Sequence, residues 1–154
     1  MSDETSILFS NLGLATVLAV ITVLVHFWGL LFLTHVMHLG RHRLRPHESR
    51  LHQAFALLIV VLGIFGLHTI EIWIYAVTYL LLGEFASFEA ALYFATSAFT
   101  TVGFGDLVVS PRWRVLSAIE SANGWILFAW STAFLLTVTT RMKLLDHEWL
   151  DPNE

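Results

Sequence analysis

Hydrophobic residues along the chain form three long stretches separated by short polar segments. From Thr5 to Gly40 there is no Asp, Glu, Lys or Arg. A helix needs about 20 apolar residues to cross the hydrocarbon core of a bilayer, so this stretch is long enough for one crossing and too short for two. The stretches 51–82 and 113–141 are of similar length and predict two further membrane-spanning helices.

A shorter helix is predicted between the second and third stretches. Ser87 is the expected N-cap, and Glu89 would lie in the first turn, where a negative charge favours the helix dipole. A helix from Phe88 to about Thr100 would be only about 18 Å long, which is too short to cross the bilayer. We therefore expect a re-entrant helix whose negative C-terminal end points toward the membrane centre.

Composition supports this assignment. Of the 154 residues, 56% are hydrophobic and only 13% are charged, whereas about a quarter of the residues of a soluble domain are charged. The absence of cysteine excludes disulfides and thiolate metal sites. The predicted fold class is an all-α membrane protein with three transmembrane helices and one re-entrant helix.

Basic residues predict the orientation of these helices. Four arginines lie in the segment 41–50, and Arg141 and Lys143 follow the third stretch. Because Lys and Arg near the ends of spans favour the cytoplasmic side, both clusters are expected to be cytoplasmic. This places the N-terminus outside and the C-terminus in the cytoplasm.

A glycine-rich segment follows the predicted short helix. It consists of Thr100, Thr101, Val102, Gly103, Phe104, Gly105 and Asp106. Glycine reaches backbone angles that other residues avoid, so the two glycines allow successive carbonyls to turn toward a common axis. Such a row of carbonyls can replace the water around a dehydrated cation.

This segment, the short helix before it and the apolar stretch after it resemble the potassium-channel family, of the small two-helix pore type, whose filter loop reads TVGYG. The resemblance covers about residues 51–141 and leaves the first helix outside. It implies a passive channel selective for potassium, which is not an enzyme and needs no cofactor beyond the permeant potassium ions. It also implies a homotetramer in contact with membrane lipids, because one chain supplies only one strand of the filter, and no nucleic acid as partner.

The resemblance also divides the chain and suggests its location. We expect 1–50 to be a transmembrane helix with a basic cytoplasmic loop, 51–143 to be the pore domain, and 144–154 to be a short cytoplasmic tail. Likeness to small prokaryotic pore proteins implies a bacterial inner (plasma) membrane. A non-selective cation channel is the nearest alternative.

Several residues depart from the pattern of the resembled channels. Phe104 replaces a common tyrosine and so removes a hydroxyl that could tie the filter to the short helix. Tyr93 and Phe94 stand where many relatives carry tryptophan, and Ser97 where some carry glutamate. We therefore expect unusual support around the filter. Gly124 is a candidate hinge of the third span by resemblance, with close helix packing as the alternative.

Polar residues inside the spans predict a buried network. His68 and Glu71 are three residues apart and share a helix face. Glu71 and Glu120 both lie roughly 12 to 17 Å below the outer ends of their spans, so they could meet behind the short helix. The network is expected to comprise His68, Glu71, Ser97, Glu120 and Asn123. One carboxyl would be protonated, because two close carboxylates resist joint ionisation, and the network would either tune the filter with pH or act as a brace.

Histidines suggest two further hypotheses. His35, His38 and His42 share a helix face on the cytoplasmic side, which suits a transition-metal site or a pH sensor, although such residues also contact lipid headgroups. His26 lies deep in the first span and is either a hydrogen-bonded packing residue or a functional one. The alternative from a different class is a non-conducting membrane protein that binds haem or a metal through His26, His35 and His38.

Overall fold

The computed structural model of the chain describes residues 2–41 and 50–141. These residues form helices joined by short connections, and no strand occurs among them. The elements are α1 (Ser2–Arg41), α2 (Arg50–Leu81), α3 (Phe88–Phe99), the short 3-10 helix η1 (Pro111–Trp113) and α4 (Arg114–Arg141). The predicted all-α fold is confirmed.

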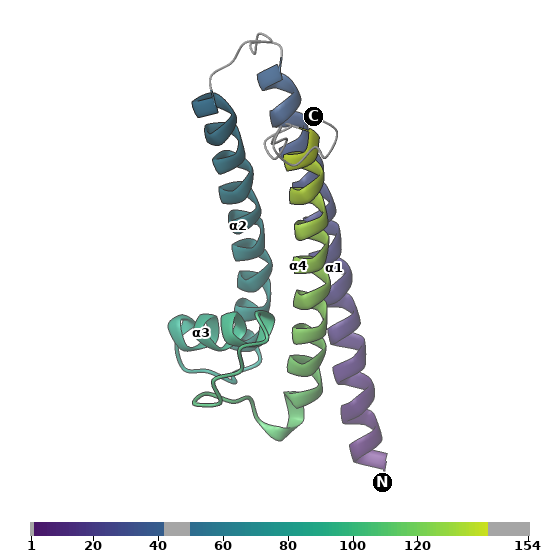
Figure 1. The fold of residues 1–154 in the computed structure, drawn as a ribbon. Coiled ribbons are helices and arrows are strands. Elements are labelled where there is room, and N and C mark those ends of the chain that lie inside the picture. The colour runs from purple at the N-terminus through teal and green to yellow at the C-terminus, as the bar shows by residue number, and fades with distance from the viewer. Residues whose placement is uncertain (1, 42–49, 142–154) are drawn as a thin grey trace, which may run out of the picture.

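Three of these helical segments are long and apolar enough to cross a membrane. They are Thr5–His38, Gln53–Leu81 and Pro111–Arg141. The long helices run side by side, and α3 lies crosswise near the end of α2, with the N-terminus toward the same end of the bundle (Figure 1). The membrane-length helices begin and end within a few residues of the bounds that the sequence predicts.

The short helix α3 has the start that the sequence predicts. Ser87 has an extended backbone (φ −135°, ψ 153°), and its hydroxyl oxygen accepts a hydrogen bond from the Ala90 amide at 3.2 Å. Glu89 lies in the first turn, near the positive end of the helix dipole. With 12 residues, α3 is about 18 Å long and cannot cross a bilayer alone.

The first helix packs along α2 and α4. A Cβ atom on Gly29 would collide with the Leu67 side chain, and one on Gly63 would collide with Leu33. These two glycines therefore allow α1 and α2 to approach closely. Near the N-terminal end of α1, the Asn11 side-chain amide donates a hydrogen bond to the Arg112 carbonyl at 2.6 Å, which ties α1 to η1.

The largest buried side chains surround the C-terminal half of α3. Tyr75 and Tyr79 come from α2, Phe99 from the end of α3, and Leu116 and Leu127 from α4, and all five are fully buried. This aromatic and aliphatic core fixes α3 between α2 and α4.

Gly124 of α4 lies directly against the end of α3. A Cβ atom at this position would collide with the backbone carbonyl oxygen of Phe99 and would lie 3.0 Å from the Phe99 carbonyl carbon and from the first ring carbon. The observed role of Gly124 is therefore close packing of α4 on α3. Its role as a hinge stays a prediction.

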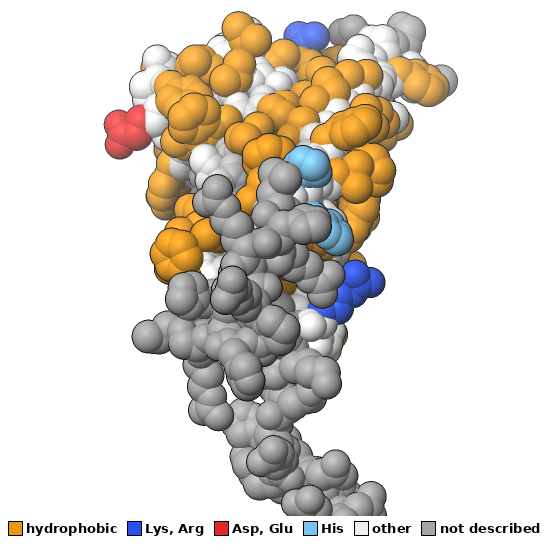
Figure 2. All heavy atoms as spheres, turned by 90° about the horizontal axis from the view of Figure 1, so that it is seen from above, with side chains coloured by type: hydrophobic (Ala, Val, Ile, Leu, Met, Phe, Trp, Pro, Cys, Tyr) orange, Lys and Arg blue, Asp and Glu red, His pale blue; other side chains and the backbone are white. Residues whose placement is uncertain are grey.

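The surface of the described residues is largely apolar. Large hydrophobic side chains are exposed along all three long helices, including Phe9, Trp28, Phe65 and Trp125, each at least 65% exposed. Seen from the end at which α1 ends and α2 begins, hydrophobic side chains dominate among the described residues, and charged ones are scattered (Figure 2). Such a surface suits contact with lipid or with other apolar protein surfaces.

We predict that Gly124→Ala destabilises the fold by about 1–3 kcal/mol, because the added methyl group meets a backbone carbonyl that cannot rotate away. Gly66→Ala is the matched control, since nothing lies within 4 Å of a Cβ atom there. The midpoint of thermal unfolding in detergent measures both effects. Equal midpoints for the two variants would contradict the packing role of Gly124.

Candidate functional site

The glycine-rich segment leaves the end of α3 with an unusual backbone. The φ angle is positive at every second residue, namely 62° at Thr101, 58° at Gly103 and 81° at Gly105. Glycine adopts this region freely, but for a β-branched threonine it is strained by about 1–3 kcal/mol. Surrounding contacts must therefore hold Thr101 in place.

The alternation of φ sign has a direct consequence for the carbonyls. In an ordinary strand, successive carbonyls point to opposite sides. Changing the sign of φ at every second residue allows successive peptide planes of the segment 101–105 to turn their oxygens to the same side. Such a row of oxygens forms a set of hard ligands suited to a dehydrated cation.

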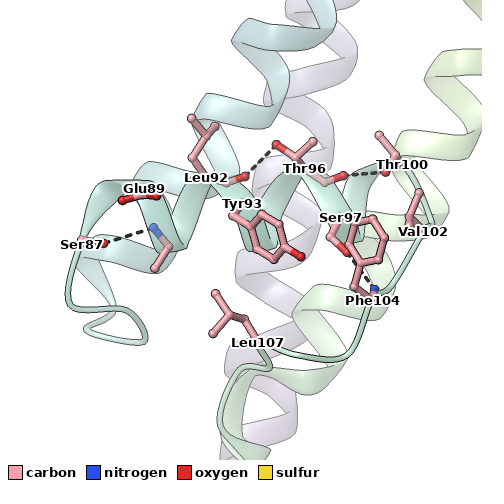
Figure 3. A pocket seen from close by; sticks show the side chains of 11 residues that line it. Ser87, Glu89, Leu92, Tyr93, Thr96, Ser97, Thr100, Val102, Phe104 and Leu107 are labelled. Carbon is pink, nitrogen blue, oxygen red and sulfur yellow. Dashed lines mark hydrogen bonds between the residues drawn. The ribbon is translucent and has the colours of Figure 1, made fainter.

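Ser97 ties this segment back to α3. Its backbone carbonyl accepts a hydrogen bond from the Gly103 amide at 3.1 Å. Its hydroxyl oxygen accepts one from the Phe104 amide, also at 3.1 Å (Figure 3). The side chain is buried between the helix and the segment. A serine thus supports the backbone where some of the resembled channels carry a glutamate.

Tyr93 supports the end of the segment that lies farther from α3 in sequence. The phenol donates a hydrogen bond to the Asp106 carboxylate at 2.9 Å, and its ring stacks on Phe104 with centroids 6.0 Å apart and planes 16° from parallel. Because the phenol donates to a carboxylate, the pKa of Tyr93 lies above its ordinary value. This contact supplies a tie between α3 and the segment, although Phe104 has no hydroxyl.

An open hollow of about 650 Å³ lies beside α3 and the segment. Tyr93, Thr96 and Ser97 line it from the helix, and Val102 and Phe104 line it from the segment (Figure 3). Val102 is 55% exposed and Phe104 is 67% exposed. The face of the chain that carries the unusual backbone is therefore uncovered.

A second polar group lies behind α3, between the long helices. Glu71 lies between two imidazoles, with one carboxylate oxygen 2.8 Å from His26 Nδ1 and the other 2.8 Å from His68 Nδ1. The Nε2 atoms of His68 and His26 lie 3.0 Å and 3.4 Å from the Ser131 hydroxyl oxygen. These four buried residues from α1, α2 and α4 close a ring of polar contacts, which we call the histidine–glutamate ring.

Glu120 and Asn123 of α4 have other partners. The Tyr79 phenol donates a hydrogen bond to Glu120 at 2.7 Å. The Asn123 amide donates to Thr22 at 2.8 Å and to the Tyr75 phenol oxygen at 3.2 Å.

The five residues of the expected network thus fall into separate groups. His68 and Glu71 lie together in the histidine–glutamate ring, whereas Glu120 and Asn123 bond to residues of α1 and α2. Ser97 bonds to the glycine-rich segment. Among the described side chains, no hydrogen bond joins Glu71 to Glu120.

The other histidines of the expected metal sites do not converge within the described part of the chain. His35 and His38 are exposed on α1, and His42 lies outside the described residues. Because α1 is continuous, His26 and His35 are roughly 13 Å apart along the helix axis. The set His26, His35 and His38 therefore does not assemble around one haem or metal ion.

Reasoning from the sequence missed several partners in these groups. The missed partners are Thr22, Tyr75, Tyr79 and Ser131. The sequence analysis also named no partner for His26, which bonds to Glu71. Each of these residues is a polar side chain inside an apolar span. An unpaired polar group is costly there, and this alone indicates that each needs a partner within the protein.

We predict that Ser97→Ala loosens the segment, because the Phe104 amide loses its acceptor. The expected cost is about 1 kcal/mol, or about fivefold faster hydrogen exchange in the segment 101–106. Tyr93→Phe keeps the stacked ring but removes the bond to Asp106, and should also speed exchange there. Thr69→Ala is the control, since Thr69 bonds only within its own helix. Unchanged exchange in both test variants would contradict this support.

Comparison with known proteins gives one match. The family model described as "Ion channel" matches residues 67–141, which include part of α2, all of α3, the glycine-rich segment and α4. No curated protein and no solved structure matches the chain significantly. The matched part contains the histidine–glutamate ring except His26, and it leaves α1 outside. Over residues 67–141, just under half of its length, this chain is therefore similar to the ion-channel family.

Proposed function

We propose that the chain forms a homotetrameric, potassium-selective channel in which residues 100–106 are the selectivity filter. The observation that carries this proposal is the positive φ at Thr101, Gly103 and Gly105, because it lets the segment present a row of carbonyls to one side. Transport through such a filter is passive and needs no chemical step.

The chemistry of the segment favours a cation. Carbonyl oxygens from Thr101 to Phe104, together with the Thr101 hydroxyl, would replace the hydration shell of the ion. The C-terminal end of α3 adds the negative end of its helix dipole directly before the segment. Asp106 adds a carboxylate at the other end of the segment.

The exposure of the filter supports assembly of several chains. One segment offers carbonyls from one side only, and a ring around an ion needs more than one copy. The open hollow beside α3, with the exposed Val102 and Phe104, leaves room for a neighbouring chain. A closed ring of identical chains satisfies this geometry, and four chains match the potassium-channel family that the sequence resembles.

The arrangement of the helices supports one orientation. Asn11 contacts Arg112, so the N-terminal end of α1 lies beside the segment that follows the filter. Arg41 and Arg141 end α1 and α4 at the opposite end of the bundle. By the positive-inside rule, the filter mouth and the N-terminus would face outward. Location in a bacterial plasma membrane rests on the resemblance to small prokaryotic pore proteins.

The groups behind α3 would act as a brace. Gly124 of α4 and His68 of α2 contact Phe99 at the end of α3. Glu71, Glu120 and Asn123 bond to side chains of the long helices instead, and so hold together the bundle on which α3 packs. A brace of this kind would keep the filter in one shape, which fits the unusual contacts of Ser97 and Tyr93.

We predict that purified protein in liposomes conducts potassium faster than sodium, with no calcium flux, as measured by ion-sensitive dyes under defined gradients. Gly103→Ala should lower potassium flux on the order of tenfold, because alanine is strained by about 1–2 kcal/mol at a φ of 58° and displaces the filter.

Gly83→Ala is the matched control for this experiment. Gly83 also has a positive φ, of 74°, with nothing within 4 Å, but it lies in the turn after α2. The Gly83→Ala variant should therefore keep the preference of the wild type for potassium over sodium. Equal sodium and potassium fluxes would favour the non-selective cation channel, and absence of any flux would overturn conduction.

We predict that the full-length chain in detergent has the mass of four copies by native mass spectrometry. Because the hollow beside α3 would face a neighbour, a cysteine introduced at Thr96 should form cross-links between chains, whereas one at Val17 on the exposed face of α1 should not. A monomer or dimer at all protein concentrations would contradict the proposed assembly.

A further inference from the structure

The histidine–glutamate ring has a hydrogen-bonding problem if it holds no cation. When both Nδ1 atoms donate to the Glu71 carboxylate, as the two 2.8 Å contacts allow, both Nε2 atoms become acceptors. Both then face the single Ser131 hydroxyl, at 3.0 Å and 3.4 Å. A hydroxyl has one proton to donate, so one buried Nε2 is left without a donor.

We propose that His26, His68 and Glu71 bind one divalent transition-metal ion, with Zn²⁺ as the expected occupant. One donor atom from each residue lies within 4.8 Å of the others, and all three residues are buried. Two imidazole nitrogens and one carboxylate oxygen form a ligand set that zinc takes in proteins, with a fourth position left open.

A metal ion resolves the hydrogen-bonding problem. If the ion binds the two Nδ1 atoms and Glu71, each imidazole carries its proton on Nε2. Both Nε2–H groups can then donate to Ser131, whose oxygen has two lone pairs. Ser131 would fix the orientation of both rings from behind, as outer partners of metal-bound histidines commonly do.

The geometry needs only small adjustments. Ligand atoms of a tetrahedral zinc site with bonds of about 2.0–2.1 Å lie about 3.3 Å apart. The contacts of 2.8 Å are slightly shorter than this separation, and the widest separation in the group stays within 4.8 Å. Side-chain shifts of about 1 Å would place all three ligand atoms around one ion.

The surroundings also accept the charge. A divalent ion with one carboxylate leaves a net charge of +1 in an apolar region. The His68 ring lies against Phe99, with centroids 6.1 Å apart, and Phe99 is the last residue of α3. The negative end of the α3 dipole therefore lies beside the site.

Such a site would join two parts of the chain that the family match separates. His26 belongs to α1, whereas His68 and Glu71 belong to the matched residues 67–141. The bound ion would thus fasten the first span to the channel domain. This inference stands on the ligand geometry and does not depend on ion conduction.

The test is metal uptake by the full-length protein in detergent. After treatment with a chelator, the protein is incubated with Zn²⁺ and freed of unbound metal. Elemental mass spectrometry then measures the zinc bound per chain. We expect about one zinc per chain more in the wild type than in Glu71→Gln or His26→Gln. Co²⁺ serves as a second probe, since a tetrahedral site with these ligands gives visible absorption.

The control is the double variant with His35→Gln and His38→Gln, whose histidines are exposed on α1. It should bind zinc like the wild type. If Glu71→Gln and His26→Gln fail to fold, Ser131→Ala tests the site, because this variant keeps all three metal ligands. It should weaken zinc binding about 10–100-fold.

Four results would overturn the proposal. Three concern the variants: equal zinc content in the wild type and the folded ligand variants, loss of binding in the exposed-histidine control, and unchanged affinity in Ser131→Ala. The fourth is absence of zinc from the wild type, which would mean that the ring is completed by an added proton instead of a metal ion.

Discussion

The end of α3 must be held at one depth, because a helix of 12 residues cannot anchor itself across a bilayer. The contact that fixes it is backbone against backbone, with Gly124 of α4 lying on the Phe99 carbonyl. The glycine-rich segment begins one residue later. Any shift of α4 relative to α3 at this point would therefore move the start of the segment, and the other supports of the segment depend on it.

Pairing of polar groups is the second constraint. In an apolar environment an unpaired carboxylate is very costly, so Glu71 and Glu120 each require partners from the protein. The partners come from different helices: His26 of α1 for Glu71, and Tyr79 of α2 for Glu120. These bonds orient α1 and α4 around α2, since apolar packing alone leaves helix rotation weakly defined in lipid.

Local features of the structure could be predicted from the sequence, because local signals encode them. Apolar length predicts the spans, and Ser87 with Glu89 predicts the start of α3. The glycine spacing identifies the segment 100–106.

Partner choice could not be predicted in the same way, because it depends on how the helices rotate against one another. Depth counting suggested that Glu71 and Glu120 could meet, but Glu120 bonds to Tyr79, about 12 Å along α2 from Glu71, and Glu71 bonds to His26. The bond from Tyr93 to Asp106 joins residues 13 apart across a strained turn, and no periodic pattern marks it. A shared helix face suggested a site at His35, His38 and His42. His35 and His38 are exposed and His42 lies outside the described residues, so this site stays a prediction.

Thr101 adopts a left-handed backbone although its branched side chain disfavours it. The free energy that this conformation costs has to come from the bonds of Ser97 and Tyr93 and from the packing of Phe99. An isolated peptide of the same sequence would relax to another shape. The conducting geometry of the proposed filter is thus a collective property of the folded chain, and a substitution that weakens a distant support acts on ion passage as if it were made in the filter itself.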